Sequence, residues 1–378
     1  MKQVKSLGLS REAYFSEQWF ANEKTRVFSN NWCFAGILKD VPTNGDYICV
    51  TVGDNPLFVI RGQDGELRAF HNICRHRGTV MLRGKGNLTN SIQCGYHCWR
   101  YELTGELKSV PQQKNQFATI EKEKLSLYPA ALEVFKGMIF VHPNPQNAID
   151  FGKWLGEFEQ HFGPYDLNNL EELYFVRHPM KANWKLFVEN HIESYHLWYA
   201  HKNSILGLDH SKQVNFYFKG HWSFFQPTLE PGQMAEFEKF IPSKIIAPDE
   251  TWYGSGDHLL YPNLGIVTGA KFDAILKAIP VTPTSSQIEI RVFGKPLPAD
   301  EPDEGVYYTA AGASDEFNVN LEDIDLCERV QEGMLSEYGG VGALAADYEQ
   351  SIRHFHEKYK SEMHEKMEYN MGAIVKAG

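Results

Sequence analysis

Two short segments of the sequence are rich in residues that bind metals: Cys-Arg-His-Arg-Gly at residues 74–78 and Cys-Gly-Tyr-His-Cys-Trp at residues 94–99. Each segment supplies a thiol and an imidazole, and the four candidate ligands are Cys74, His76, Cys94 and His97. Two loops that each deliver one sulfur and one nitrogen can hold either a single tetrahedral zinc ion or a binuclear iron–sulfur cluster. The residue types alone do not decide between these two metal centres.

The distribution of the ligands between the loops favours the cluster. Zinc fingers usually take two cysteines from one knuckle and two histidines from the other, whereas here each loop carries one of each. A [2Fe-2S] centre of the Rieske type needs two cysteines on one iron and two histidines on the other, and two hairpin loops can deliver them. The set Cys74, His76, Cys94 and His97 thus suits a Rieske-type [2Fe-2S] cluster, and a single zinc ion is the alternative.

Length and charge narrow the class of protein. The chain has 378 residues, of which 43% are hydrophobic, and this is enough for two packed cores. Its 37 basic and 48 acidic residues give a net charge of −11, which argues against a nucleic-acid or anionic-membrane partner. Six cysteines are too few for a disulfide scaffold, and the N-terminal segment lacks the pattern of a secretory signal. No apolar run reaches the roughly 18 to 20 residues of a membrane helix, so we expect a cytoplasmic protein.

The chain divides into three predicted parts. Residues 1–30 read as a helical segment that packs on the C-terminal domain, residues 31–145 as an all-β domain, and residues 146–378 as an α+β domain with an antiparallel sheet. The α+β domain carries a predicted helix from Trp184 to about Tyr199. No G-x-G-x-x-G or P-loop motif is present, so a pyridine nucleotide or flavin is expected to act from another protein.

The two ligand segments resemble the Rieske motif of ring-hydroxylating and related oxygenase α subunits. Two residues depart from this motif: Cys98 stands where the family usually has Gly, and Arg100 stands where a small polar residue is common. Neither residue occupies a ligand position, but an extra thiol beside the cluster can change its reduction potential or its sensitivity to oxidation. The resemblance implies a Rieske domain followed by a catalytic domain of the helix-grip type.

A second group of candidate ligands follows in the predicted helix: Glu193, His196 and His201. At about 100° per residue, Glu193 and His196 share one side of a helix, whereas His196 and His201 lie about 140° apart. The two histidines therefore converge on one ion only if the helix loosens or ends between them. Two histidines and a carboxylate form the facial triad with which non-haem Fe(II) oxygenases bind dioxygen beside substrate.

The carboxylate that completes this triad is either Glu193 itself or one from the Glu-Asp-Ile-Asp segment at residues 322–325. In a predicted helix over residues 321–335, Asp323 lines up with the apolar face, whereas Asp325 lines up with charged residues. Because a buried carboxylate without a partner is costly, an inward Asp323 needs a partner such as a metal. We therefore choose Asp323. The resemblance agrees, because the family's iron-binding Asp sits in a similar Glu-Asp segment ahead of a Val-Gln pair.

The resemblance also implies roles for residues around the histidines. Asn190 matches the family's pattern and is carried over as a catalytic residue. The resemblance makes Glu193 a conduit for electrons rather than an iron ligand, since His97 of one protomer would lie near Glu193 of the next, and this carboxylate would hydrogen-bond to His196. Such a head-to-tail arrangement implies a ring, most simply a homotrimer.

The two metal sites together predict a terminal oxygenase. Oxygenation at a mononuclear Fe(II) needs two electrons per turnover, and a Rieske cluster in the same chain can pass on single electrons from a ferredoxin or an NAD(P)H-dependent reductase. We expect the enzyme to use O2 to hydroxylate or oxidatively demethylate a small organic substrate. The resemblance is closest to the branch without β subunits, which includes enzymes for glycine betaine, carnitine and aromatic acids.

The candidate pocket residues are compatible with two classes of substrate. Two segments are candidates for lining its pocket, Phe216 to Phe225 and Leu259 to Ile266. An aromatic pocket suits an arene, and it equally suits a quaternary ammonium group through cation–π contact. Aromatic-ring dihydroxylation, as in aromatic compound catabolism, is therefore the alternative within the family. A Rieske electron-transfer protein without oxygenase activity is the alternative of another class, and the second iron motif argues against it.

Overall fold

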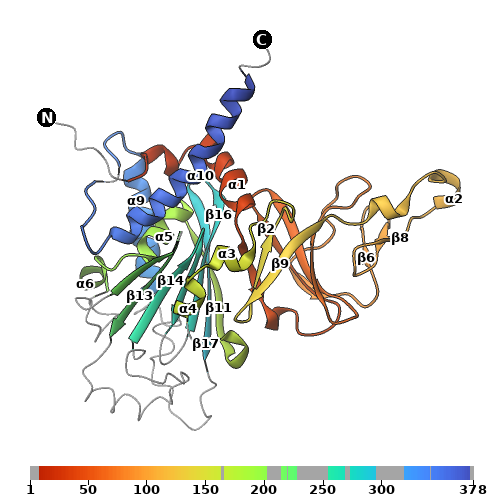
Figure 1. Cartoon of the computed structure of the whole chain (residues 1–378), viewed down its shortest axis with the longest axis horizontal. Coiled ribbons are helices and arrows are strands. Elements are labelled where there is room, and N and C mark those ends of the chain that lie inside the picture. Colours follow the sequence, from red (N-terminus) through yellow and green to blue (C-terminus); the bar gives the residue numbers. More distant parts are fainter. Residues whose placement is uncertain are drawn as a thin grey trace, which may run out of the picture. The chain divides into compact units, whose positions relative to one another are not determined.

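The chain forms two compact units (Figure 1). The computed structural model describes residues 8–162, 166–201, 214–218, 220–227, 254–268, 273–294, 319–340 and 342–374. One unit, the β unit, comprises Glu23–Trp154, and the other, the mixed unit, combines Met1–Asn22 with Leu155–Gly378. Within the described ranges, no helix is both long enough and apolar enough to cross a membrane.

The β unit is built from two antiparallel sheets. Seven short strands form the larger sheet in the order β1-β10-β9-β4-β3-β2-β5. Their bounds are Cys33–Ile37 (β1), Asp46–Val52 (β2), Asn55–Arg61 (β3), Leu67–His71 (β4), Lys85–Asn87 (β5), Pro129–Phe135 (β9) and Met138–His142 (β10). The smaller sheet consists of β6 (Ile92–Gln93), β7 (Arg100–Tyr101) and β8 (Leu107–Ser109). The short helices α2 (Gln113–Gln116) and α3 (Phe151–Leu155) belong to the same unit.

A two-residue turn illustrates how the sequence sets the hairpins of this unit. Gly53 and Asp54 connect β2 to β3. Gly53 has φ +60°, and a Cβ atom at this position would lie 2.3 Å from the carbonyl oxygen of Lys24. Only glycine meets both the conformational and the steric requirement of this turn.

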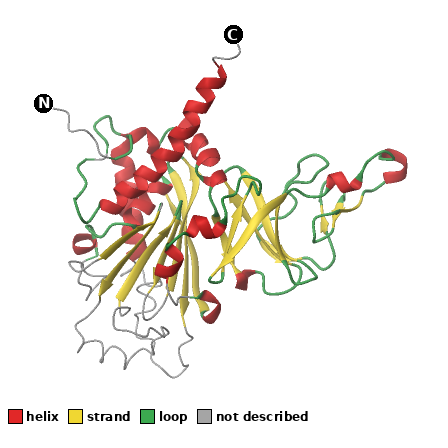
Figure 2. Cartoon of the chain, in the orientation of Figure 1, coloured by secondary structure: helices red, strands yellow, loops and turns green. Residues whose placement is uncertain are grey.

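The mixed unit holds a second seven-stranded antiparallel sheet, in the order β11-β17-β16-β15-β14-β13-β12. Its strands are β11 (Glu171–Met180), β12 (Val214–Phe218), β13 (His221–Pro227), β14 (Gly254–Leu260), β15 (Leu264–Thr268), β16 (Asp273–Thr282) and β17 (Ser285–Gly294). Its helices include α4 (Phe158–Phe162), α5 (Trp184–His191), α6 (Leu197–Ala200), α9 (Val319–Leu335) and α10 (Gln350–Ile374). Figure 2 shows α9 and α10 together at one end of the strands. An all-β unit and a unit with helices beside an antiparallel sheet confirm the predicted fold class.

Two hydrogen bonds attach the N-terminal segment to the helices of the mixed unit. The Tyr14 hydroxyl donates to Glu189 Oε1 on α5 at 2.7 Å. Trp19, at the start of α1 (Glu17–Arg26), donates its indole N–H to the Tyr359 hydroxyl on α10 at 2.6 Å. Both tyrosines are fully buried. The first of these contacts holds α5, the helix that leads into the predicted histidine ligands.

Candidate metal centres

The four candidate cluster ligands lie on two loops of the β unit. Cys74 and His76 follow β4, whereas Cys94 and His97 lie between β6 and β7. Both cysteines belong to a buried apolar cluster of this unit. The Nδ1 atoms of His76 and His97 are 3.1 Å apart. Two nitrogens that bind the same metal ion, each at about 2.1 Å, have a separation of this size.

The spacing of these four ligand atoms distinguishes a cluster from a single ion. Around one tetrahedral zinc, all four ligand atoms would lie within about 4 Å of one another. Among the residues that the structure describes, no three ligand atoms of the cysteine–histidine set come within 4.8 Å of one another. A pair of histidine nitrogens and a second pair of buried, neighbouring thiols therefore fits a binuclear [2Fe-2S] cluster better than zinc.

The two loops share a backbone pattern that explains why the family motif carries glycine at the position of Cys98. In each loop, the amide four residues after the cysteine donates to the cysteine carbonyl, from Gly78 to Cys74 at 2.9 Å and from Cys98 to Cys94 at 3.1 Å. Gly78 has φ +75° and Cys98 has φ +55°, so both lie in the left-handed region. This region favours glycine, which is the residue that the family motif carries at the position of Cys98.

Aromatic side chains hold the ligands in place. The ring of Trp99 stacks on His76, with centroids 4.9 Å apart and planes inclined by 7°. The Tyr101 hydroxyl accepts a hydrogen bond from the Arg75 amide at 3.0 Å and lies 3.4 Å from Cys74 Sγ. When Cys74 is a thiolate, as it is in a cluster, the hydroxyl is the only possible donor between these two atoms.

Three candidate ligands of the second site converge in the mixed unit. The ligand atoms of His196, His201 and Asp323 lie within 4.8 Å of one another, and in the described part of the chain no other group of three or more such residues does so. Asp323 Oδ1 is 2.9 Å from His201 Nε2 and 3.5 Å from His196 Nε2. His201 is fully buried and Asp323 is 9% exposed. Two imidazoles and one carboxylate are the donor set of the non-haem Fe(II) facial triad.

The two histidines lie at opposite ends of a short helix, and the end of that helix brings them together. The single helix predicted from Trp184 to about Tyr199 is wrong, because α5 ends before the histidines and a second, four-residue helix, α6, follows. His196 directly precedes α6 and His201 directly follows it. His201 thus lies beyond the last helical turn, and the two rings are only 5.1 Å apart. The chain avoids the wide angle between them that a continuous helix imposes.

Glu193 stabilises the break between α5 and α6. Its carboxylate accepts hydrogen bonds from the amides of Tyr195 and His196, which have no helical carbonyl partner at the start of α6. These two amides precede α6, so the carboxylate stabilises the turn that leads into this helix and competes with a continuous helix. The same carboxylate also contacts His196 Nδ1, as the family resemblance implies.

Each histidine of the triad therefore has a carboxylate at its outer nitrogen. Glu193 contacts Nδ1 of His196, and Glu322 Oε2 lies 2.7 Å from Nδ1 of His201. Such contacts fix the ring orientation and direct Nε2 toward the metal position. The sequence singles out Glu322 only as the neighbour of Asp323, so its role at the second histidine emerges from the structure.

Asp325, the competing carboxylate on α9, lies elsewhere. It is exposed and forms an ion pair with Arg329 at 2.6 Å, one helical turn along the same surface. Asp323 occupies the buried face of the helix, together with Cys327 and Met334. The two aspartates are two residues apart, which corresponds to about 200° of helix rotation, so they lie on nearly opposite sides of α9.

The electrostatics at the triad favour a cation. Burial lowers the pKa of His196, but the hydrogen bonds with Asp323 and Glu193 outweigh this effect and raise it to about 10. Burial raises the pKa of Asp323, and the two histidines outweigh it and lower this pKa to about 2. The buried carboxylates thus demand positive charge at the point where the ligand atoms converge, and a divalent ion supplies it.

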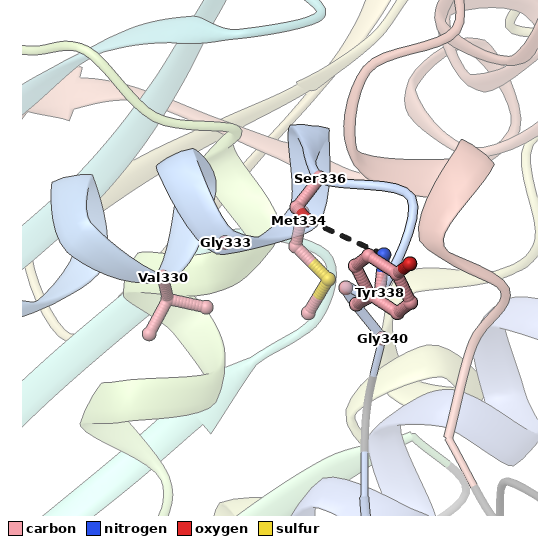
Figure 3. A pocket seen from close by; sticks show the side chains of 7 residues that line it. Val330, Gly333, Met334, Ser336, Tyr338 and Gly340 are labelled. Carbon is pink, nitrogen blue, oxygen red and sulfur yellow. Dashed lines mark hydrogen bonds between the residues drawn. The ribbon is translucent and has the colours of Figure 1, made fainter.

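Two cavities lie along α9, and only one of them reaches the triad. The first, of about 260 Å³, is lined by Asn190, Glu193 and His196 and by apolar residues of α5 and α9. The second, of about 370 Å³, lies at the end of α9, where Val330, Met334 and Tyr338 line it (Figure 3). Among the described residues that line the second cavity, none is a carboxylate, histidine or cysteine.

The predicted substrate-pocket segments are mainly core where their side chains are described. Trp222 is 2% exposed, and its indole N–H donates to Asn215. Tyr261 is 1% exposed, and its hydroxyl donates to Glu362 of α10 at 2.8 Å. The side chains of Phe216, Phe224 and Phe225 lie outside the described residues.

Comparison with known proteins relates both sites to one group of enzymes. Residues 31–133 match the family model of the Rieske [2Fe-2S] domain, and residues 167–365 match that of the ring hydroxylating alpha subunit, catalytic domain. The carnitine monooxygenase oxygenase subunit of Acinetobacter pittii is 30% identical over 349 residues, which cover 89% of this chain and 88% of the relative. The glycine betaine monooxygenase oxygenase subunit of Chromohalobacter salexigens is 34% identical over 206 residues, or 53% of this chain and 45% of the relative.

Solved structures share the fold over nearly the whole chain. A quaternary ammonium Rieske monooxygenase, whose structure is described as giving insights into carnitine oxidation and inter-subunit electron transfer, superposes with a TM-score of 0.78. It is 24% identical, and the match covers 96% of each chain. Naphthalene 1,2-dioxygenase from Rhodococcus sp. superposes with a TM-score of 0.76 at 21% identity, over 94% of each chain.

Proposed function

This chain belongs to the family of Rieske non-haem iron oxygenase α subunits, and we propose that it oxidises an N-methylated quaternary ammonium compound. As a terminal oxygenase, it uses O2 together with electrons from a separate NAD(P)H-dependent reductase. The observation that carries the substrate proposal is the similarity to a carnitine monooxygenase over 89% of the chain. The net charge of −11 is compatible with a cationic substrate.

The enzyme uses a Rieske [2Fe-2S] cluster and a mononuclear Fe(II). We assign the cluster to Cys74, His76, Cys94 and His97, and the Fe(II) to His196, His201 and Asp323, whose donor atoms fit these two groups. When bound, the two groups supply electron transfer and O2 activation, so that one oxygen atom enters the substrate and the other leaves as water, with two electrons and two protons.

The surrounding residues prepare both sites for this chemistry. Trp99 and Tyr101 fix His76 and Cys74, so the cluster ligands need little rearrangement when an electron arrives. At the second site, the outer carboxylates hold each imidazole in the tautomer that leaves Nε2 free to bind. We assign residues 31–145 to the domain that accepts electrons and residues 146–378 to the domain that oxygenates the substrate.

We further propose that the electron passes between protomers of a head-to-tail homotrimer, from His97 of one to Glu193 of the next. The contact between Glu193 and His196 supports this route, because it gives the carboxylate a direct hydrogen-bond link to the iron-binding ring. Asn190 lies beside Glu193 in the same cavity, and we assign it a catalytic role there. A ring is the assembly that repeats such a contact and closes.

A coupling assay tests the substrate proposal. The holoenzyme is reduced anaerobically, mixed with one candidate compound and then exposed to O2, while cluster oxidation and product are followed together. We expect carnitine, glycine betaine or a related N-methyl compound to couple cluster oxidation to hydroxylation or demethylation. Coupling with naphthalene or an aromatic acid, and with no quaternary ammonium compound, would instead support aromatic-ring oxygenation, as the fold shared with naphthalene dioxygenase allows.

Replacing Glu193 with glutamine tests the electron route. The amide still accepts the Tyr195 amide hydrogen bond, so we expect both metal groups to remain bound and the helix break to persist. Steady-state turnover should fall by a factor on the order of 100 or more, because glutamine cannot carry the carboxylate charge at His196. Near-normal coupled turnover with full iron content would overturn the assignment. The trimer itself is checked by sedimentation of the wild-type holoenzyme.

We also place the enzyme in the cytoplasm. None of its six cysteines forms a disulfide, as is common in a reducing compartment, and its electrons come from NAD(P)H. Fractionation of cells that produce the protein tests this location.

A further inference from the structure

Strand β14 carries an aspartate to which the assignments above give no role. Asp257 lies opposite Phe224 of β13 and Val267 of β15. Its neighbour His258 points to the face of the sheet where α4 packs, since the His258 ring lies 5.3 Å from the ring of Phe162. Because successive side chains of a strand point to opposite faces, Asp257 points to the other face.

That other face is the one on which α5 lies. Gly265 of β15 pairs with Leu259, which shares the face of Asp257. A Cβ atom at Gly265 would lie 2.7 Å from Nε2 of His191, the last residue of α5. Asp257 therefore projects on the side of the sheet that carries α5 and the histidine ligands beyond it.

Asp257 and its cross-strand partner Val267 also differ from their neighbours in exposure. Among the residues of β14 and β15 whose burial is described, these two alone are partly exposed, and all the others are buried. The pair faces a point on the inner side of the sheet that solvent reaches. This face of β14 and β15 is the one that His191 contacts at Gly265, and Asp257 interacts electrostatically with His196, so the point lies near the iron triad.

The carboxyl group of Asp257 has no cation of its own. It makes no hydrogen bond or ion pair with the described residues. The group that acts on its charge is the His196 ring, whose nitrogens already face Glu193 and Asp323. Burial raises the pKa of Asp257 to about 7. A carboxylate in such a setting is stabilised by a cation that enters from solvent.

We propose that the Asp257 carboxylate is the electrostatic anchor for the cationic nitrogen of the substrate, and that it selects trimethylammonium compounds over neutral compounds of the same shape. This inference rests on the proposed function, because it names the residue that recognises the quaternary ammonium group. A quaternary nitrogen has no N–H to donate, so its charge must be recognised by a nearby anion or by aromatic faces.

The position of Asp257 suits the reaction as well as the charge. In an N-methyl compound, the carbon that is oxidised is bonded directly to the nitrogen, at about 1.5 Å. An anchor for that nitrogen must therefore lie beside the iron-binding histidines rather than at a distance from them. Asp257 meets this condition, since it lies on the inner face and interacts with His196.

Matched pairs of ligands separate charge from shape. Glycine betaine and 3,3-dimethylbutanoate differ in that a carbon replaces the charged nitrogen, and choline and 3,3-dimethylbutan-1-ol form a second such pair. Affinities for the anaerobic, reduced holoenzyme are measured by calorimetry for the wild type, Asp257→Asn and Asp257→Glu. Asp325→Asn is the control, because it removes the same charge from an exposed side chain of α9.

We expect the wild type to prefer the charged member of a pair, and Asp257→Asn to reduce that preference by about tenfold or more, the equivalent of about 1.4 kcal/mol. Asp257→Glu and Asp325→Asn should keep the preference. The visible spectrum of the cluster and the iron content confirm that each variant is folded and loaded. An unchanged preference in a loaded Asp257→Asn enzyme overturns the inference. If the wild type neither binds nor oxidises any quaternary ammonium compound, the proposed function itself fails, and the variants are not needed to show it.

Discussion

The two metal sites of this protein use histidine in opposite ways. In the β unit, His76 and His97 turn Nδ1 toward each other, and His76 stacks on the ring of Trp99. In the mixed unit, the histidines turn Nε2 inward, and each Nδ1 contacts a carboxylate, Glu193 or Glu322. Aromatic surroundings suit a cluster that only exchanges electrons, whereas carboxylates strengthen binding of a divalent ion. The neighbours of the ring, rather than the ligand type, therefore distinguish the two sites.

The sites also differ in how far apart in the chain their ligands lie. All four cluster ligands fall within residues 74–97, on the two loops that follow β4 and β6. At the triad, His201 and Asp323 are 122 positions apart and meet only when α9 packs against α5. The triad therefore depends on the tertiary fold, and changes in α9 should affect it without disturbing the cluster.

The largest expected effect follows from removing Asp323. Asp323→Ala deletes one of three ligand atoms and leaves the histidines without their central carboxylate, so the mononuclear iron should be lost. Iron analysis should fall from about three to about two atoms per chain, with the visible spectrum of the cluster unchanged. Coupled turnover should disappear. Asp325→Asn serves as the control and should retain all the iron, because Asp325 is exposed and paired with Arg329. Equal iron loss in both variants would reverse the assignment.

A smaller effect is expected at Glu322. Glu322→Ala removes the partner of His201 Nδ1, so the ring loses its fixed orientation and Fe(II) affinity should fall by about 10- to 100-fold. Competition with a chelator measures this affinity. Glu322→Gln keeps an acceptor for the ring N–H and should recover most of the loss. Identical affinities for the alanine variant and the wild type would show that the contact has no role in metal binding.

The contrast between local and distant ligands also explains what the sequence predicts. Cys74, His76, Cys94 and His97 are recognisable as candidate ligands from their spacing, because one pair of loops carries all four. Asp323 is predictable because the apolar pattern of α9 turns it inward. The break before α6 is not predictable from periodicity, since it depends on Glu193 accepting two backbone amides. Asp257 and Glu322 carry no local signal at all, because their importance arises from contacts between distant segments.

A third test addresses the cluster site, where the effect should be moderate. Tyr101→Phe removes the hydroxyl that is directed at Cys74 Sγ. Hydrogen bonds to cluster sulfurs stabilise the reduced, more negative state, so the reduction potential should fall. A hydrogen bond of about 1 kcal/mol corresponds to about 40 mV for one electron. Redox titration of the visible spectrum measures the shift, and Fe(II) affinity at the triad should not change. A potential equal to that of the wild type would mean that the hydroxyl does not reach the sulfur.

The smallest effect compares the two cluster loops with each other. Gly78 and Cys98 occupy equivalent left-handed positions, but only one is glycine. A side chain in this conformation costs about 1 kcal/mol, and no atom lies within 4 Å of a Cβ placed at Gly78, so backbone strain alone should govern Gly78→Ala. We expect Gly78→Ala to lower and Cys98→Gly to raise the urea midpoint of cluster loss, each by the equivalent of about 0.5 to 1 kcal/mol. The gain at Cys98 is the smaller of the two, because glycine also adds entropy to the unfolded chain. Stabilisation by both substitutions, or by neither, would show that the loops are not equivalent and that the Cys98 thiol contributes through its own contacts.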